Sequence, residues 1–234
     1  MIINEFDINT VKPDALYLII GSNLSGKTTI IHDIIHANRY LFGTTGTYIT
    51  STYEKQKHII ESDIGNDKII YLNNESTYLD TIKTEIYNSL TSISSSHISI
   101  DCLLKSQSWI YDSSFKDLFH YGNINKTMRI LAFDNVPKIP NDNKSQIDYI
   151  FISNGLEFEE INNIYDIYIK KLSFSEFLSL YSLLEPYDFI VIEISFNKIK
   201  YYVYNSENHT STTNDELNYE EEILNGKIKI SIII

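Results

Sequence analysis

The stretch Gly21-Ser-Asn-Leu-Ser-Gly-Lys-Thr28 matches the phosphate-binding P-loop pattern G-x-x-x-x-G-K-[ST] at every fixed position. It follows the apolar run 15–20, which is typical of a buried strand, and it precedes a helical pattern with isoleucine at 30, 31, 34 and 35. Strand, loop and helix in this order are the context in which the pattern binds phosphate. The stretch therefore predicts a nucleoside triphosphate site. The alternative is a Gly/Ser-rich turn before a helix, but a turn requires neither the lysine nor the threonine.

The chemistry of phosphate binding explains the spacing of the motif. Gly21 and Gly26 can adopt backbone angles denied to other residues, so successive N–H groups can point inward at phosphates. The helix that begins near Lys27 adds about half a positive charge at its N-terminus. We expect Lys27 to reach the β- and γ-phosphates and the Thr28 hydroxyl to ligate Mg²⁺. The expected nucleotide-binding residues are Gly21, Ser22, Asn23, Leu24, Ser25, Gly26, Lys27, Thr28 and Thr29.

Composition favours a soluble intracellular globular protein. The chain has 234 residues, of which 43% are hydrophobic and 13% aromatic, and this content excludes a disordered chain. No apolar stretch approaches the roughly 20 residues that span a bilayer, and the N-terminus lacks the basic and apolar regions of a signal peptide. Cys102 is the only cysteine, which excludes an internal disulfide and fits a reducing compartment.

The charge balance is acidic, with a formal net charge of −12 at pH 7. A protein that grips nucleic acid usually carries a basic patch, and the densest loose group of basic residues here is Lys105, Lys116, Lys126 and Arg129. A ring-shaped motor can concentrate a few lysines in its pore and stay acidic elsewhere. The acidic net charge therefore argues against nucleic-acid binding without excluding it.

Strands and helices alternate along the first two thirds of the chain. The expected strands are 15–20, 47–52, 68–72, 97–101, 128–133 and 148–152. The expected helices include 54–61, 77–90 and a segment in which Tyr111, Phe115, Leu118 and Phe119 share one face. Such alternation predicts an α/β fold, here a P-loop NTPase with a mostly parallel sheet covered by helices on both faces.

The pattern changes near residue 156, although no firm domain boundary is visible. Two apolar helix faces lie within 161–172 and 174–184, and the runs 189–195 and 199–204 predict a β-hairpin. An acidic polar loop is expected at 205–222 and a final strand at 227–234. We therefore expect a single domain, with a nucleotide-binding core over 1–155 and a helical and β extension over 156–234.

A P-loop enzyme also needs an acidic residue at the end of a neighbouring apolar strand, where it holds Mg²⁺. Asp101 ends the strand 97–101 and is the best candidate; the alternative is an aspartate that caps the following helix. Asp134 ends the strand 128–133 and competes for the same role. Its neighbour Asn135 could instead hydrogen-bond the γ-phosphate or the attacking water. The candidate catalytic residues are thus Lys27, Asp101, Asp134 and Asn135, and the candidate metal ligands are Thr28 and Asp101.

The order of these segments resembles that of a known family over roughly residues 5–200. The P-loop is followed by the strand ending at Asp101, then by 115–122, 129–140 and 148–152, and then by the helices that contain 174–178. This arrangement resembles the genome-packaging ATPases of poxviruses and related large DNA viruses, within the FtsK–HerA superfamily of DNA-pumping motors. Within it, only the P-loop is specific by itself.

The resemblance implies ATP hydrolysis by a homo-oligomeric ring that pulls double-stranded DNA into a preformed capsid. Carried over by position, Lys27 and Thr28 bind phosphate and Mg²⁺, Asp101 is the Walker B acid, and Asp134 or Asn135 stands at the position of a polar sensor. Capsid proteins are implied partners, and the host cytoplasm (a virus factory) or the virion is the implied location.

The chain departs from the family at two positions, so two other hypotheses for its function remain open. Cys102 follows Asp101 where members usually carry a second acid, and Asn143 and Lys144 stand where members show an arginine. A thiol is a poor base for activating water. The second reading is therefore a nucleotide-binding assembly module with weak or no hydrolysis. A small-molecule kinase is a third reading, but a phosphate-clamping lid needs several arginines and the chain has two, Arg39 and Arg129.

Overall fold

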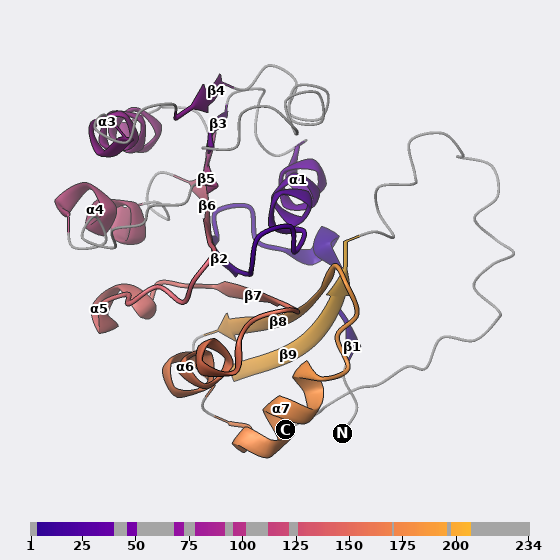
Figure 1. The fold of residues 1–234 in the computed structure, drawn as a ribbon. Helices are drawn as coiled ribbons and strands as arrows, with labels where there is room; N and C mark the ends of the chain where they lie inside the picture. Colours follow the sequence, from indigo (N-terminus) through magenta and orange to yellow (C-terminus); the bar gives the residue numbers. More distant parts are fainter. Residues whose placement is uncertain are drawn as a thin grey trace, which may run out of the picture.

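The computed structural model describes residues 4–39, 46–50, 68–72, 78–91, 96–101, 112–121, 126–169, 171–195 and 198–206 (Figure 1). Within these ranges the strands form one nine-stranded sheet of order β1-β9-β8-β7-β2-β6-β5-β3-β4. The strands are β1 (Asn4–Glu5), β2 (Leu16–Ile20), β3 (Gly46–Thr50), β4 (Lys68–Tyr71), β5 (Ser96–Asp101), β6 (Thr127–Phe133), β7 (Tyr149–Ser153), β8 (Asp188–Ser195) and β9 (Lys198–Asn205). The helices are η1 (Ile8–Thr10), α1 (Lys27–Asn38), α3 (Tyr78–Thr91), α4 (Ser113–Tyr121), α5 (Asn141–Lys144), α6 (Phe158–Tyr168) and α7 (Phe174–Tyr181).

The strand that leads into the P-loop lies in the middle of the sheet. β2 pairs in parallel with β6 on one side and with β7 on the other. Its side chains alternate between two hydrophobic clusters, Leu16, Leu18 and Ile20 in one and Tyr17 and Ile19 in the other. Since successive side chains of a strand point to opposite faces, a strand that is apolar throughout must be covered on both.

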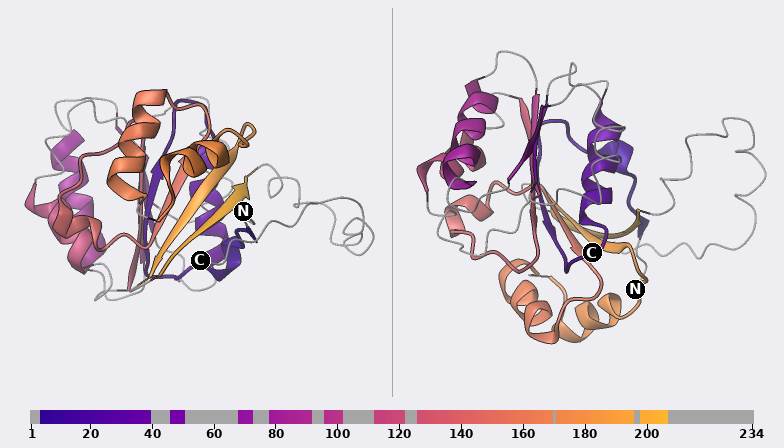
Figure 2. Two further views of the ribbon diagram at one scale, coloured as in Figure 1. Left: turned by 90° about the horizontal axis from the view of Figure 1, so that it is seen from below. Right: turned by 45° about the horizontal axis from the view of Figure 1, so that its top comes forward.

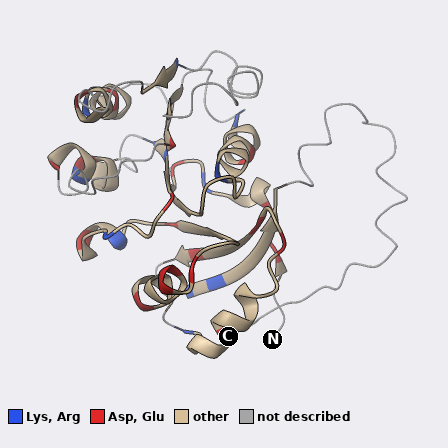
Figure 3. Cartoon of the chain, viewed as in Figure 1, with Lys and Arg blue, Asp and Glu red and all other residues tan. Residues whose placement is uncertain are grey.

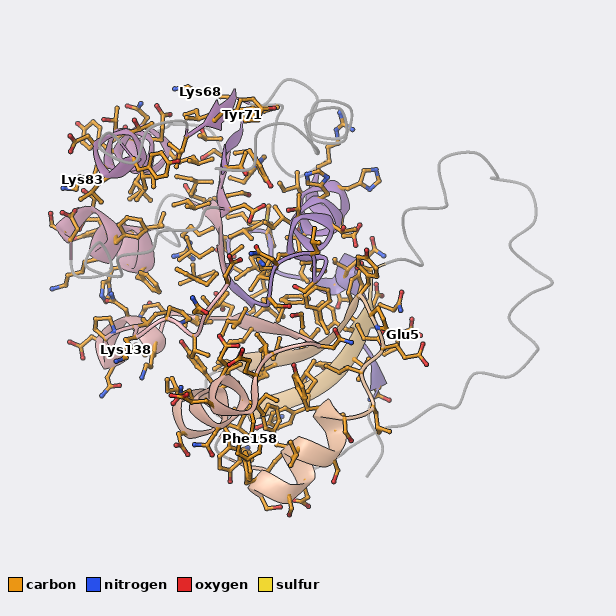
Figure 4. All side chains as sticks on the ribbon, in the orientation of Figure 1. Glu5, Lys68, Tyr71, Lys83, Lys138 and Phe158 are labelled. Atoms are coloured by element: carbon orange, nitrogen blue, oxygen red, sulfur yellow. The ribbon has the colours of Figure 1, made fainter. Side chains whose placement is uncertain are left out.

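Helices cover the two faces of the sheet unequally (Figures 1 and 2). The cluster on one face includes apolar side chains of α1 and η1, while that on the other face includes side chains of α3, α4, α6 and α7. Figure 4 shows these side chains filling the space between the helices and the sheet. The predicted α/β fold with a mostly parallel sheet and helices on both faces is confirmed.

The C-terminal hairpin belongs to the same sheet as the nucleotide-binding strands. β8 is antiparallel to both β7 and β9, as the predicted hairpin requires. The N-terminal strand β1 then pairs in parallel with β9, joining Asn4 to Tyr202 and Glu5 to Val203. Phe6 is buried beside it, with its ring edge-on to those of four aromatic residues: Tyr149, Phe151, Tyr202 and Tyr204. The division of the chain at residue 155 stays a prediction.

Three short elements were not expected from the sequence. β1 has two residues, η1 has three, and the four-residue helix α5 lies in a segment typical of a Pro/Asn/Asp loop. Several predictions lie outside the described residues: the helix 54–61, Cys102, Lys105, Tyr111, nearly all of the loop 205–222 and the strand 227–234. No helix in the described ranges has both the length and the apolar character needed to cross a bilayer.

Arg129 is a structural residue. The prediction that it belongs to a basic group available to nucleic acid is wrong. It lies on β6 and is completely buried. Its guanidinium donates to the carbonyl oxygens of Leu118 (3.1 Å) and Phe119 (3.0 Å) in the last turn of α4, and to that of Asp14 (2.8 Å) before β2. Burial lowers its pKa to about 10. Arg129 thus closes the C-terminal end of a helix, where carbonyl groups lack partners within the helix, and it is not available to nucleic acid.

Candidate nucleotide-binding site

The P-loop connects β2 to α1 at the carboxyl edge of the parallel strands. The backbone N–H of Gly21 donates to the carbonyl of Phe133 at the end of β6, at 3.0 Å. Gly26 precedes α1 with a φ of 93°, in the left-handed region that favours glycine. A Cβ at position 21 would collide with the hydroxyls of Ser25 and Ser153. Both glycines are therefore required by the path of the loop.

The ammonium of Lys27 is buried and surrounded by oxygen atoms. Nζ lies 2.8 Å from the carbonyl oxygen of Gly21, 2.7 Å from that of Ser22 and 2.7 Å from Oδ1 of Asp134. The ion pair with Asp134 is largely shielded from solvent, since the two side chains are only 9% and 15% exposed. A phosphate bound by the loop and the Asp134 carboxylate would therefore compete for the same ammonium group.

Thr28 and Asp101 form the second part of the site. Thr28 Oγ1 donates to Asp101 Oδ2 at 2.8 Å, and the hydroxyl of Tyr48 on β3 donates to the same oxygen at 2.9 Å. Burial raises the pKa of Tyr48 well above its usual value, and the charge of Asp101 raises it further. Tyr48 therefore remains a proton donor and fixes the orientation of the Asp101 carboxylate.

The Thr28–Asp101 pair suits Mg²⁺ in its chemistry. Both residues supply oxygen atoms, the ligands that Mg²⁺ prefers, and Mg²⁺ typically takes one or two protein carboxylates and completes its shell with water and phosphate oxygens. Among the described residues there is no group of three or more His, Cys, Asp or Glu side chains that would hold a metal ion by themselves.

The other predicted loop residues differ in exposure. Asn23 and Leu24 are exposed at the tip, while Ser22 and Thr29 are half-buried. Ser25 is buried, and its hydroxyl has no hydrogen-bond partner within the described part of the chain. A buried hydroxyl without a partner inside this loop is a donor that a phosphate oxygen would satisfy.

The strand order explains why the predicted acidic residues meet. β6 lies between β2 and β5, so Asp134 follows the strand next to the P-loop and Asp101 ends the strand after that. Because parallel strands end at one edge of the sheet, both carboxylates face the loop. Asn135 is exposed directly after Asp134. The structure thus brings Lys27, Thr28, Asp101 and Asp134 together, although their roles in catalysis stay predictions.

The sequence did not indicate Tyr48 as a site residue, and it predicted no contacts for Asn143 and Lys144. Tyr48 was expected to lie on a strand, but no local pattern indicates that it meets Asp101, which is 53 positions away. Asn143 is buried on α5, and its Oδ1 lies 3.1 Å from Nε2 of His120. Lys144 lies beside the ring of Tyr168, with 6.0 Å from Nζ to the ring centroid.

The described basic residues are distributed over several elements of the fold. Figure 3 shows Lys and Arg scattered over several elements of the cartoon. Lys116 and Lys126 are exposed, while Arg129 of the same predicted group is buried. Of the described members of that group, two therefore remain accessible to nucleic acid and Arg129 does not.

No family model and no curated protein matches the sequence. Solved structures share its fold at low identity. The genome-packaging NTPase B204 of Sulfolobus turreted icosahedral virus 2, in complex with AMP, has a TM-score of 0.58 at 14% identity, over 82% of this chain and 98% of B204. Its complex with ATP-γS gives a TM-score of 0.57 at 17% identity, with the same coverage.

A bacterial ATPase shows the same fold within a longer chain. EssC (ATPases 2 and 3) from Geobacillus thermodenitrificans has a TM-score of 0.54 at 10% identity, over 82% of this chain and 40% of EssC. Viral and bacterial ATPases thus align with most of the chain. The chain therefore has the P-loop ATPase fold that its resemblance to genome-packaging ATPases of the FtsK–HerA superfamily predicts.

Proposed function

We propose that this protein is an ATPase that drives double-stranded viral DNA into a capsid. The observation that carries the proposal is the meeting of the Lys27 ammonium, the Thr28–Asp101 pair and Asp134 at one edge of the sheet. The likeness in fold to a viral genome-packaging NTPase supports it. The proposal includes a homo-oligomeric ring, capsid proteins as partners, and action in the host cytoplasm or in the virion.

The proposed roles follow from the charges and donors of the site. The backbone N–H groups of the loop and Lys27 bind the phosphates, and Thr28 with Asp101 holds Mg²⁺, which neutralises charge on the β- and γ-phosphates. Asp134 and Asn135 follow the strand next to the loop, where a polar side chain can orient the attacking water. The phosphate takes over the ammonium of Lys27 that the Asp134 carboxylate otherwise binds.

Phosphate release from MgATP, measured with and without double-stranded DNA, tests the proposal. The wild type is compared with Lys27→Ala, and Lys12→Ala serves as a matched control because Lys12 is an exposed lysine outside the loop. We expect turnover that rises with DNA, disappears in Lys27→Ala and persists in Lys12→Ala. Turnover that survives Lys27→Ala would contradict the assignment of the site.

A nucleotide-binding assembly module is the second candidate, because Cys102 stands at the position of a second acid. This candidate predicts that MgATP binds without DNA-stimulated turnover. Cys102→Glu supplies the missing carboxylate, and Cys102→Ser is the control without an acid. A gain of turnover only in Cys102→Glu would assign the wild type to the binding module, whereas wild-type turnover that rises with DNA would exclude that candidate.

A further inference from the structure

Different groups of strands lie on the two sides of the P-loop strand β2. Asp134, which pairs with the Lys27 ammonium, follows β6, and Asp101, the candidate Mg²⁺ residue, ends β5; both lie on one side of β2. On the other side of β2 lie β7 and β8. A nucleotide that the loop held with its γ-phosphate toward Asp101 would extend its nucleoside away from β5, toward β7 and β8.

Tyr187 borders the P-loop on that second side. It directly precedes β8, and a Cβ placed on Gly26 would lie only 2.8 Å from Cδ1 of its ring. The ring therefore packs directly against the last glycine of the loop. Tyr187 is also 36% exposed, so the ring is not fully enclosed by the core.

The backbone of Tyr187 is held in a conformation that large side chains rarely adopt. Its φ is 66°, in the left-handed region where glycine and asparagine are favoured. Asp188 fixes the turn: its backbone N–H donates to the carbonyl of Glu185 at 3.0 Å, and its carboxylate accepts from the N–H of Glu185 at 2.9 Å and from the Asn205 amide at 2.7 Å. The Tyr187 carbonyl accepts from the N–H and hydroxyl of Ser206, each at 3.3 Å.

A turn that is fixed this firmly holds its strained residue in one position. Residues with such backbone angles persist only where their surroundings over-determine them, and they cluster at ligand-binding sites. At this φ the backbone of a tyrosine is more strained than that of a glycine would be. Its ring is only partly buried in the core. These observations together indicate that the ring serves a ligand.

We propose that the ring of Tyr187 stacks on the base of the bound nucleotide. The proposal rests on the proposed function, because it assumes that the P-loop binds the phosphates. An aromatic ring can stack on any base, because every base has a π-face.

Calorimetric titration with two ligands, MgATP and magnesium tripolyphosphate, tests the base contact separately from the phosphate contact. We expect Tyr187→Gly to weaken MgATP binding by roughly ten- to a hundredfold, the range typical for loss of one stacked base. Tripolyphosphate has no base, so its affinity is expected to stay the same. Tyr187→Phe retains the ring and is expected to bind MgATP as the wild type does.

Stability measurements and a control variant distinguish a ligand-binding role of Tyr187 from a structural one. Tyr187→Gly and Tyr187→Asn both suit a positive φ, so thermal denaturation is expected to show no loss of stability while MgATP binding falls. A purely structural Tyr187 would not separate these two readouts. Tyr121→Gly removes an exposed tyrosine at the end of α4 and is expected to leave both affinities unchanged.

The outcomes distinguish failure of this inference from failure of the proposed function. If the wild type binds MgATP no more tightly than tripolyphosphate, or if Tyr187→Gly binds MgATP as the wild type does, the base contact is wrong and the phosphate site stands. If the wild type binds neither ligand, both the assignment of the phosphate site and that of the base contact are wrong. Lys27→Ala is expected to lose both ligands.

Discussion

Asp134 is the residue whose charge competes most directly with a bound phosphate. Its carboxylate lies 2.7 Å from the buried ammonium of Lys27. We expect Asp134→Asn to lower the free energy of unfolding by about 1–3 kcal/mol, because a charged hydrogen-bond acceptor is replaced by a neutral one. MgATP is expected to reduce this difference, since its phosphates give Lys27 another anionic partner.

Urea denaturation of Asp134→Asn and wild type, with and without MgATP, measures this effect. Lys200→Gln is the control: it removes a pair with Glu193 in which the lysine side chain is 52% exposed, and exposed pairs contribute little to stability. A destabilisation by Asp134→Asn that is the same with and without MgATP would mean that phosphate does not take over Lys27.

Tyr48 acts on the site through Asp101. Tyr48→Phe removes one of the two hydrogen bonds to Asp101 Oδ2 and is expected to weaken Mg²⁺ affinity by about tenfold, as loss of a hydrogen bond to a metal ligand typically does. Titration of nucleotide binding with Mg²⁺ measures the shift. Tyr17→Phe is a matched control, because its buried hydroxyl donates to the Lys12 carbonyl instead. An equal shift in both variants would exclude a specific role for Tyr48.

At the scale of elements, Arg129 joins β6 to the end of α4. Arg129→Met leaves three carbonyl groups without their charged donor, and we expect it to lower the free energy of unfolding by about 3 kcal/mol or more. Lys116→Met on the exposed side of α4 is expected to change it by about 0.5 kcal/mol or less. Denaturant unfolding compares the two. Similar values would show that the buried guanidinium is not what holds α4.

The elements that sequence reasoning found are those long enough to show a period. β2 is apolar on both faces, α6 and α7 each bury one apolar side, and β8 with β9 read as a hairpin. The short elements β1, η1 and α5 were not predicted, because two, three and four residues are too few to show a repeat. The pairing of β1 with β9 also joins segments far apart in the chain, which no local pattern records.

At the scale of the whole molecule, the high tyrosine content predicts sensitivity to alkali. Burial raises the pKa of Tyr17, Tyr48, Tyr168 and Tyr204 above the usual value and that of Tyr149 to about 12. In the unfolded chain these tyrosines lose their protons near pH 10, whereas in the folded protein they keep them. Their contribution to stability is therefore complete below about pH 10 and is lost as the pH rises toward the folded pKa values.

At about pH 11 we expect the loss to reach about 1.4 kcal/mol for each such tyrosine. Urea unfolding at neutral and alkaline pH, followed together with tyrosinate absorbance, measures it. The lowered pKa of Arg129 acts in the opposite sense, but it is one group against five. Stability that stays constant up to about pH 11 would contradict the burial of these hydroxyls.

The candidate site was predictable only in part, for reasons that lie in the sheet order. The P-loop motif indicates Lys27 and Thr28 directly, and the ends of apolar strands indicate Asp101 and Asp134. Tyr48 and Tyr187 reach the site only because β3 lies next to β5 and β8 next to β7. A sequence indicates where the strands lie in the chain but not which strands are neighbours in the sheet. Site residues that are brought in by the strand order therefore cannot be predicted from it.

The pairing of β1 with β9 has a consequence for self-association. An open strand edge invites another chain to add a strand, and natural proteins block such edges with lysines or a short covering strand. Here Lys198 and Lys200 occupy the first half of β9, and β1, anchored by Phe6, covers Tyr202 and Val203 in the second. Strand addition at this edge is thereby disfavoured, so the proposed ring would have to form through contacts other than strand pairing here.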